Sequence, residues 1–302
     1  MVNYILTIEK QKEINEMIDK LTDKVNNRVA NNRSFDLVYC ELSKELMDII
    51  KLVIEHEKEY KCGYNIDKAL IFGGMVRICK LLEIINKLIE SEMMEYEVAM
   101  DYSRKVIELS ISVRYLIKNY GNKETIDRYK YNAKKTEIVF IKKYKDKSKS
   151  FLINSAILSA EKMIKQLRIA NNVNKGVSVI KMFEGVGEQN LYDDVYRTLS
   201  HSIHCDSMDI LRNDIVEGAD NKFNLNFKRG DSNIRMYNPL LSIIIQPTSD
   251  LLYKFDSDLD KEMVTHELHV LFQAIEKLPS VFDKYIKLKN VNKNIDKTAK
   301  LG

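Results

Sequence analysis

The chain has 302 residues, 45% of them hydrophobic and 30% charged, which is typical of a folded globular protein and excludes an intrinsically disordered one. Its 48 basic and 44 acidic residues leave a net charge of only +4, so charge alone does not indicate a nucleic-acid-binding protein. Three prolines and ten glycines are few for this length, and their scarcity favours long helices.

Neither a membrane segment nor an export signal is expected. No stretch approaches the ~18 consecutive apolar residues of a membrane span. The amino-terminal apolar patch is followed by charges without a small-residue cleavage site. Cys40, Cys62, Cys79 and Cys205 are scattered, which favours reduced thiols over disulfides or zinc ligands. We therefore expect a cytoplasmic protein with no membrane contact, no cofactor and no metal.

Helical periodicity predicts six helices in the first part of the chain. Ser34 and Asp67 are expected to cap the second and third, and Gly121 to stop the fourth. The six helices cover residues 7–22, 35–57, 68–90, 95–120, 123–147 and 151–169.

Two of these helices have unusual compositions. The third is apolar almost all the way round, which predicts a buried central helix in which Gly73 and Gly74 let a neighbour approach closely. The fifth is basic and contains Tyr129, Tyr131 and Tyr144. Such a helix could follow a nucleic-acid backbone and stack on bases, but we favour a solvated helix face.

The second part of the chain combines helices with one predicted hairpin. A helix over residues 191–211 follows a short one within residues 171–190. Apolar and polar residues then alternate on either side of Gly230-Asp231, which is typical of a β-hairpin. Pro239 opens an apolar segment broken by Pro247, and a last helix over 258–288, with a kink at Pro279, precedes a frayed polar tail.

The predicted fold class is all-α, an antiparallel helical bundle with a small β-hairpin insertion. Residues 1–218 are expected to form the helical bundle that carries the motif described next. Residues 219–302 are expected to form the hairpin and carboxy-terminal helices packed on that bundle, so that the two parts make one structural unit.

The stretch Tyr196–His204, "YRTLSHSIH", is the strongest candidate site. Each residue of an α-helix advances about 100°, so Arg197 and His204 point within roughly 20° of each other. His201 lies one turn from Arg197, while Tyr196, Ser200 and His204 follow at steps of four. One helix face therefore combines arginine, histidine, serine and tyrosine.

This residue set fits hydrolytic or phosphoryl chemistry. Histidine exchanges protons near neutral pH, and the planar guanidinium of arginine holds a phosphate. The alternative, which the nine residues alone favour, is that Tyr196 and His204 are buried polar groups satisfied across a helix interface while Arg197 lies on the surface.

A second polar pair lies in the fourth helix. Arg104 and Glu108 are one turn apart within the largely apolar stretch "VAMDYSRKVIELSISVRYLI". A partly buried ion pair is costly unless its groups are satisfied, so it indicates a structural network or a site. We expect the pair to face Tyr196, Ser200 and His204.

The stretch "SRKVIELSISVRYLI" followed by "YRTLSHSIH" resembles a family of uncharacterised, mostly bacterial helical proteins that carry R-x3-E and then Y-x3-S-x3-H. The matching positions are Arg104, Glu108, Tyr196, Ser200 and His204, and the resemblance covers roughly residues 69–211. This family has no established activity.

A more distant resemblance is to the HEPN superfamily of helical bundles, whose ribonuclease members carry an arginine a few residues before a histidine. Arg197 and His204 have six residues between them. The resemblance implies metal-independent action on the ribose 2'-hydroxyl and the scissile phosphate, often across a dimer interface. His204 would then be the acid/base and Arg197 the phosphate-binding group, with His201 beside them.

A metal site is a third alternative. His266 and His269 follow Glu262 on the last helix, so the three side chains could share a face. The spacing differs from H-E-x-x-H, and we favour solvated or interhelical histidines here.

These patterns lead to two functional hypotheses. The first is a cytoplasmic, metal-independent RNA-cleaving or nucleotide-binding protein, for instance a toxin or phage-defence effector, with RNA or a nucleotide as partner and a homodimer as a candidate assembly. If it is an enzyme, it is an endoribonuclease. The second is a non-enzymatic ligand-binding or protein-interaction module with a buried network of Arg104, Glu108, Tyr196, Ser200 and His204.

Overall fold

The computed structural model describes residues 8–91, 96–145, 154–155, 157–162, 165–166, 175–196, 215–217, 223–225 and 234–299. Long helices dominate these residues, and the all-α class is confirmed. Their bounds are α1 Ile8–Asn26, α2 Asn32–Glu55, α3 Ile66–Glu90, α4 Tyr96–Lys118, α5 Lys123–Lys145, α11 Ile234–Lys254 and α12 Lys261–Ala299. The shorter elements are α7 Val179–Val186, α8 Gln189–Leu191, the π-helix η1 Tyr192–Tyr196 and the strands β1 Ile215–Glu217 and β2 Phe223–Leu225.

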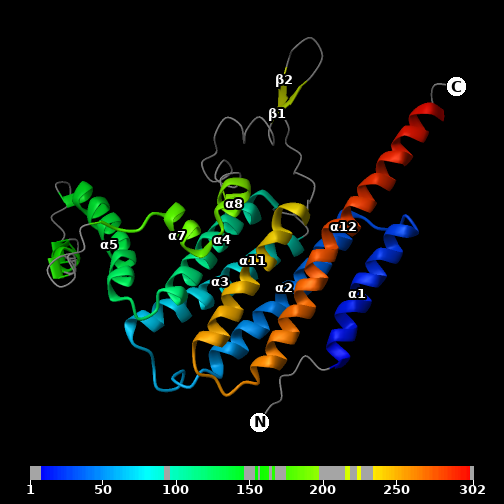
Figure 1. Ribbon diagram of the computed structural model, residues 1–302. Helices are drawn as coiled ribbons and strands as arrows, with labels where there is room; N and C mark the ends of the chain where they lie inside the picture. The colour runs from blue at the N-terminus through cyan, green and yellow to red at the C-terminus, as the bar shows by residue number, and fades with distance from the viewer. Residues whose placement is uncertain are drawn as a thin grey trace.

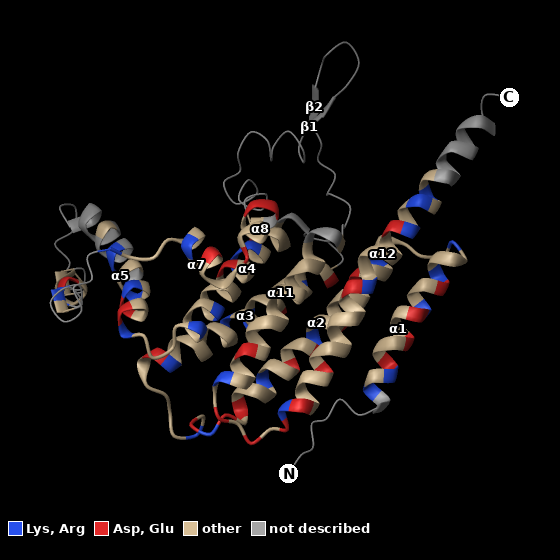
Figure 2. Ribbon diagram, in the orientation of Figure 1, with Lys and Arg blue, Asp and Glu red and all other residues tan. Residues whose placement is uncertain are grey.

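The long helices pack side by side around one core (Figure 1). Helix α11 contacts α2, α4 and α12, while α3 contacts α2 and α4. Helix α1 lies on the outside against α12 and α2, and α7 lies on α4. Acidic and basic residues alternate along α1 and along the described part of α12 (Figure 2). The carboxy-terminal helices therefore bury their apolar faces against the amino-terminal ones.

Asparagines, rather than the residues expected from the sequence, cap two of these helices. Asn31 caps α2 in a capping box, in which its side chain accepts from the backbone N–H of Ser34 and the Ser34 hydroxyl accepts from the backbone N–H of Asn31. Asn65 caps α3 by accepting from the backbone N–H of Lys68. Ser34 and Asp67 lie inside the first turns, where Ser34 completes the box and the Asp67 carboxylate favourably meets the positive end of the helix.

The prediction that Pro239 opens the apolar segment and that Pro247 breaks it is wrong. Helix α11 runs through Pro239 and Pro247, and α12 runs through Pro279 and on to Ala299, past the expected end at Leu288. An interior proline costs about 3 kcal/mol. Burial of an apolar side chain stabilises the folded protein by about 1.5–3 kcal/mol. Helix α11 buries five of them, which together outweigh the cost of the two prolines: Leu240, Leu241, Ile244, Leu251 and Leu252. Once α12 is held by its packed part, adding residues at its end costs little.

The predicted hairpin about Gly230-Asp231 is also wrong. β2 pairs antiparallel with β1, upstream in the chain, with Val216 opposite Asn224. Ile234, expected in the second hairpin arm, instead begins α11. The pattern was ambiguous because Ile234, Tyr237, Leu241 and Ile244 also fall on one face of a helix, and all four are buried.

The two glycines of α3 differ, contrary to the expectation that both allow close packing. A Cβ built on Gly74 would lie 2.5 Å from Cγ2 of Val113 on α4, whereas one built on Gly73 meets nothing within 4 Å. The prediction that α3 is a buried central helix also needs correction, since Val76 and Ile84 on one side of it are exposed. Only Gly74 is required for the approach of α4.

Tyr129 and Tyr131 of α5 do not form the exposed row that a nucleic-acid surface would need. Basic residues of the same helix are exposed, as on a solvated helix face: Lys123, Arg128 and Lys135. Tyr131 is buried and Tyr129 packs against the core, where burial raises its pKa. The side chain of Tyr144 lies outside the described residues.

We predict opposite effects for two neighbouring substitutions in α3. Gly73→Ala should raise the free energy of unfolding by ~0.5–1 kcal/mol because alanine favours the helix and meets open space. Gly74→Ala should lower it by ~1–3 kcal/mol because the stiff Val113 side chain must move. Urea denaturation of both variants tests this, and equal effects would contradict the described approach of α4 to α3.

Candidate functional site

The Tyr196 hydroxyl joins the two charged residues that α4 presents toward η1. Nη2 of Arg104 donates a hydrogen bond to Tyr196 Oη at 3.1 Å, and Tyr196 Oη donates to Oε2 of Glu108 at 2.9 Å. The guanidinium also lies over the tyrosine ring, with Cζ 4.7 Å from the ring centroid. The arginine and the glutamate are thus linked through Tyr196, which lies 92 residues after Arg104 in the sequence.

An aromatic cluster holds Tyr196 in this position. Its ring stacks on Tyr192 with centroids 5.3 Å apart, and Phe183 of α7 packs against both rings. Phe183 is fully buried, so α7 supplies a firm support for the turn that carries the tyrosines. This turn is π-helical, a rare geometry that is found frequently at functional sites.

The environment of Tyr196 favours its neutral form. Only 6% of the residue is exposed, and burial is the largest cause that raises the pKa of its hydroxyl. The Arg104 hydrogen bond and charge act in the opposite direction, while the Glu108 carboxylate raises the pKa further. At neutral pH the protonated hydroxyl can therefore accept from Arg104 and donate to Glu108 at the same time.

Arg104 keeps hydrogen-bonding capacity beyond this bridge. Its Nε is buried and has no hydrogen-bond partner among the described residues. A guanidinium has five N–H donors in a planar fork, which suits a carboxylate or a phosphate.

A second polar network lies farther along α4 and was missed in the sequence. Arg114 Nη1 lies 2.6 Å from Oε1 of Glu188, directly before α8, and Arg114 Nε lies 3.3 Å from Oδ2 of Asp250 on α11. Arg114 interrupts the same apolar stretch as Arg104, and a charge in such a stretch is the sequence feature that could have predicted this network. Its partners are 74 and 136 residues away, and only the packing of the helices brings them together.

The predicted site residues divide into two groups. Arg104, Glu108 and Tyr196 come together as expected, whereas Arg197, Ser200, His201 and His204 lie outside the described residues. The α-helical spacing assumed for the whole segment 191–211 does not hold at its beginning, because Tyr192–Tyr196 is π-helical.

Both histidines of α12, His266 and His269, are exposed. His269 Nε2 lies 2.8 Å from the side-chain nitrogen of Gln273, one turn later. Across the part of the chain that the structure describes, no group of three or more histidine, cysteine, aspartate or glutamate side chains is arranged to hold a metal ion. Likewise, none of the described helices is both long and apolar enough to cross a membrane.

The family comparison covers the part of the chain that contains this site. Residues 68–223, just over half of the chain, match the model of a family of unknown function, DUF5677. The chain belongs to this family. The match confirms the expected membership in an uncharacterised family, and it spans α3, α4 and the Tyr196–His204 segment of this DUF5677 member. No curated protein and no solved structure matches the chain.

We predict that Tyr196→Phe lowers the free energy of unfolding by ~1–3 kcal/mol, because two half-buried charged groups lose a partner while the ring is retained. Tyr192→Phe is the matched control, since it changes a neighbouring ring of the same cluster, and its effect should stay below ~0.5 kcal/mol. Urea denaturation compares the two, and an unchanged stability of Tyr196→Phe would contradict the bridge.

The raised pKa of Tyr196 also predicts a pH dependence. Because the folded-state pKa exceeds the unfolded value of about 10, the folded protein retains this proton to higher pH. The contribution to stability is therefore complete below about pH 10 and falls as the pH rises through the folded-state pKa. Wild type should therefore lose more stability than Tyr196→Phe as the pH rises above about 10, as measured by urea denaturation at each pH.

Proposed function

We propose that this DUF5677 member is a cytoplasmic, metal-independent RNA-cleaving or nucleotide-binding protein in which Arg197 and His204 carry the chemistry. The observation that supports the proposal is the anchoring of Tyr196, the first residue of the motif, to Arg104 and Glu108. Arg197 is bonded directly to Tyr196 in the chain. An anchored start of the segment suits a site whose groups must be held in one geometry.

The chemistry of this proposal requires two kinds of group. A histidine takes the proton of the ribose 2'-hydroxyl as its oxygen attacks phosphorus, and a proton returns to the leaving 5'-oxygen, which leaves a cyclic phosphate. An arginine stabilises the negative charge on the phosphate oxygens. In this proposal His204 and Arg197 have these roles, with His201 as a further acid/base.

Arg104 has a supporting role in the proposal. Its Nη2 is bound to Tyr196, and its buried Nε has no hydrogen-bond partner among the described residues. Together with Glu108 and Ser200 it would orient the segment rather than transfer protons. The proposal extends to the toxin or phage-defence role and to a homodimer, which the HEPN resemblance implies.

We expect the purified protein to cleave RNA in the presence of EDTA. Arg197→Ala and His204→Ala should each reduce the cleavage rate by a factor of ~10²–10⁴ with an unchanged far-ultraviolet circular dichroism spectrum. His269→Ala, which removes a histidine of α12, is the control and should cleave like wild type. Intact RNA with wild-type protein, or equal rates for all variants, would reject the ribonuclease proposal.

A specific observation favours a second candidate, a non-enzymatic ligand-binding or protein-interaction module. Tyr196 is almost fully buried, and its hydroxyl both accepts and donates a hydrogen bond, as in a structural network. In that case His204→Ala lowers the melting temperature and no variant cleaves RNA. The same set of variants, measured by thermal unfolding, therefore separates the two candidates.

A further inference from the structure

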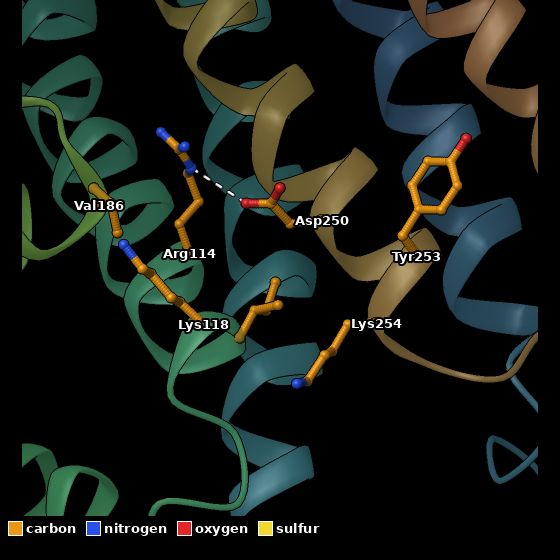
Figure 3. A pocket seen from close by; sticks show the side chains of 7 residues that line it. Arg114, Lys118, Val186, Asp250, Tyr253 and Lys254 are labelled. Carbon is orange, nitrogen blue, oxygen red and sulfur yellow. Dashed lines mark hydrogen bonds and ion pairs between the residues drawn. The ribbon is translucent and has the colours of Figure 1, made fainter.

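A cleft of about 430 Å³ lies between α4, α11 and the end of α7 (Figure 3). Its apolar lining comes mainly from Ile117 and Val186. Its charged lining comes from Arg114, Lys118, Lys254 and Asp250. This volume is within the range of small-molecule sites, which combine apolar walls with a few placed polar groups.

The charges around the cleft are unequal. Three cationic side chains line the cleft, whereas only two carboxylates lie beside them: Asp250 in the lining and Glu188, the other partner of Arg114. Lys254 has no ion pair among the described residues, and it is exposed. Lys118 uses one of its three ammonium hydrogens on the carbonyl of Gly185, 2.7 Å away. Donors for a further negative group are therefore available.

Arg114 is held in a fixed position beside the lysines. The side chain is only 15% exposed, and its two carboxylate partners come from different segments of the chain. Asp250 is itself oriented by Gln246, whose Nε2 donates to Oδ1 at 2.8 Å. The two ion pairs use two of the five guanidinium donors, so Arg114 can still donate to an anion.

We propose that this cleft binds a small organic anion whose carboxylate or phosphate group is held by Arg114 and Lys118, whose apolar body lies against Ile117 and Val186, and whose charge is also attracted by the exposed Lys254. A guanidinium and an ammonium group recognise either head group by charge-assisted hydrogen bonds, and a second ammonium group strengthens the attraction of the cleft for an anion. The apolar walls contribute by removing the body of the ligand from water. The proposal goes beyond the proposed RNA chemistry and uses neither Arg197 nor His204.

Phenyl phosphate, benzoate and the uncharged benzyl alcohol are suitable probes, because they share an apolar ring and differ in charge. In calorimetric titrations of the full chain at low ionic strength, at least one of the two anions should bind with a Kd below ~1 mM, and benzyl alcohol should not. The preference between the anions distinguishes a phosphate from a carboxylate ligand. Equal binding of benzyl alcohol, or no binding of either anion, would overturn the proposal.

Lys254→Glu is the decisive variant because it reverses an exposed charge that makes no ion pair within the described residues. It should weaken anion binding about tenfold or more. Lys284→Glu, an equally charged change at an exposed position of α12, is the matched control and should have little effect. Equal affinities of the two variants would contradict the site.

Methyl nuclear magnetic resonance locates the ligand independently of the variants. The aromatic ring of the bound probe should shift the methyl signals of Val186 and Ile117 in the cleft. The exposed Val29, which follows α1, should not respond. Shifts confined to other methyl groups would show that the anion binds elsewhere and would reject the cleft.

Discussion

The packing of α4 against α3, α11 and α7 is the constraint on which both polar networks depend. The approach to α3 is close because Gly74 leaves room for Val113. Buried residues along α4, including Val106, Ile107, Ile111 and Leu116, fix the rotation of the helix about its axis. This rotation decides which partners its polar side chains can reach.

Charged groups next to a core need partners, and α4 has two sets of them. Arg104 and Glu108 meet Tyr196 near the middle of the helix, and Arg114 meets Glu188 and Asp250 ten residues after Arg104. Ten residues correspond to about 15 Å along a helix. Glu188 and Tyr196 lie at the two ends of the short α8–η1 segment, so this segment is attached to α4 at both ends.

The two networks suit different chemistry. In the first, a nearly buried tyrosine hydroxyl accepts from a cation and donates to an anion, which stabilises one conformation of the motif's first residue. In the second, the arginine lines a cleft and retains donors beside two lysines. The first is suited to positioning, and the second to recognition of a charged ligand. Membership in a family of unknown function leaves both roles to be decided by the site rather than by the fold.

The sequence by itself determined the all-α class, the approximate extent of the long helices and the expectation that Arg104 and Glu108 face Tyr196. These follow from local periodicity and from charges placed in apolar stretches, and both are visible along a single segment. Tertiary structure alone decided that α11 continues through Pro239 and Pro247, because burial of its apolar face outweighs the local cost of proline. It also decided that Ile234 begins a helix and that Arg114 meets Glu188 and Asp250. Contacts between residues far apart in the sequence arise from the packing of whole helices, which no local pattern encodes.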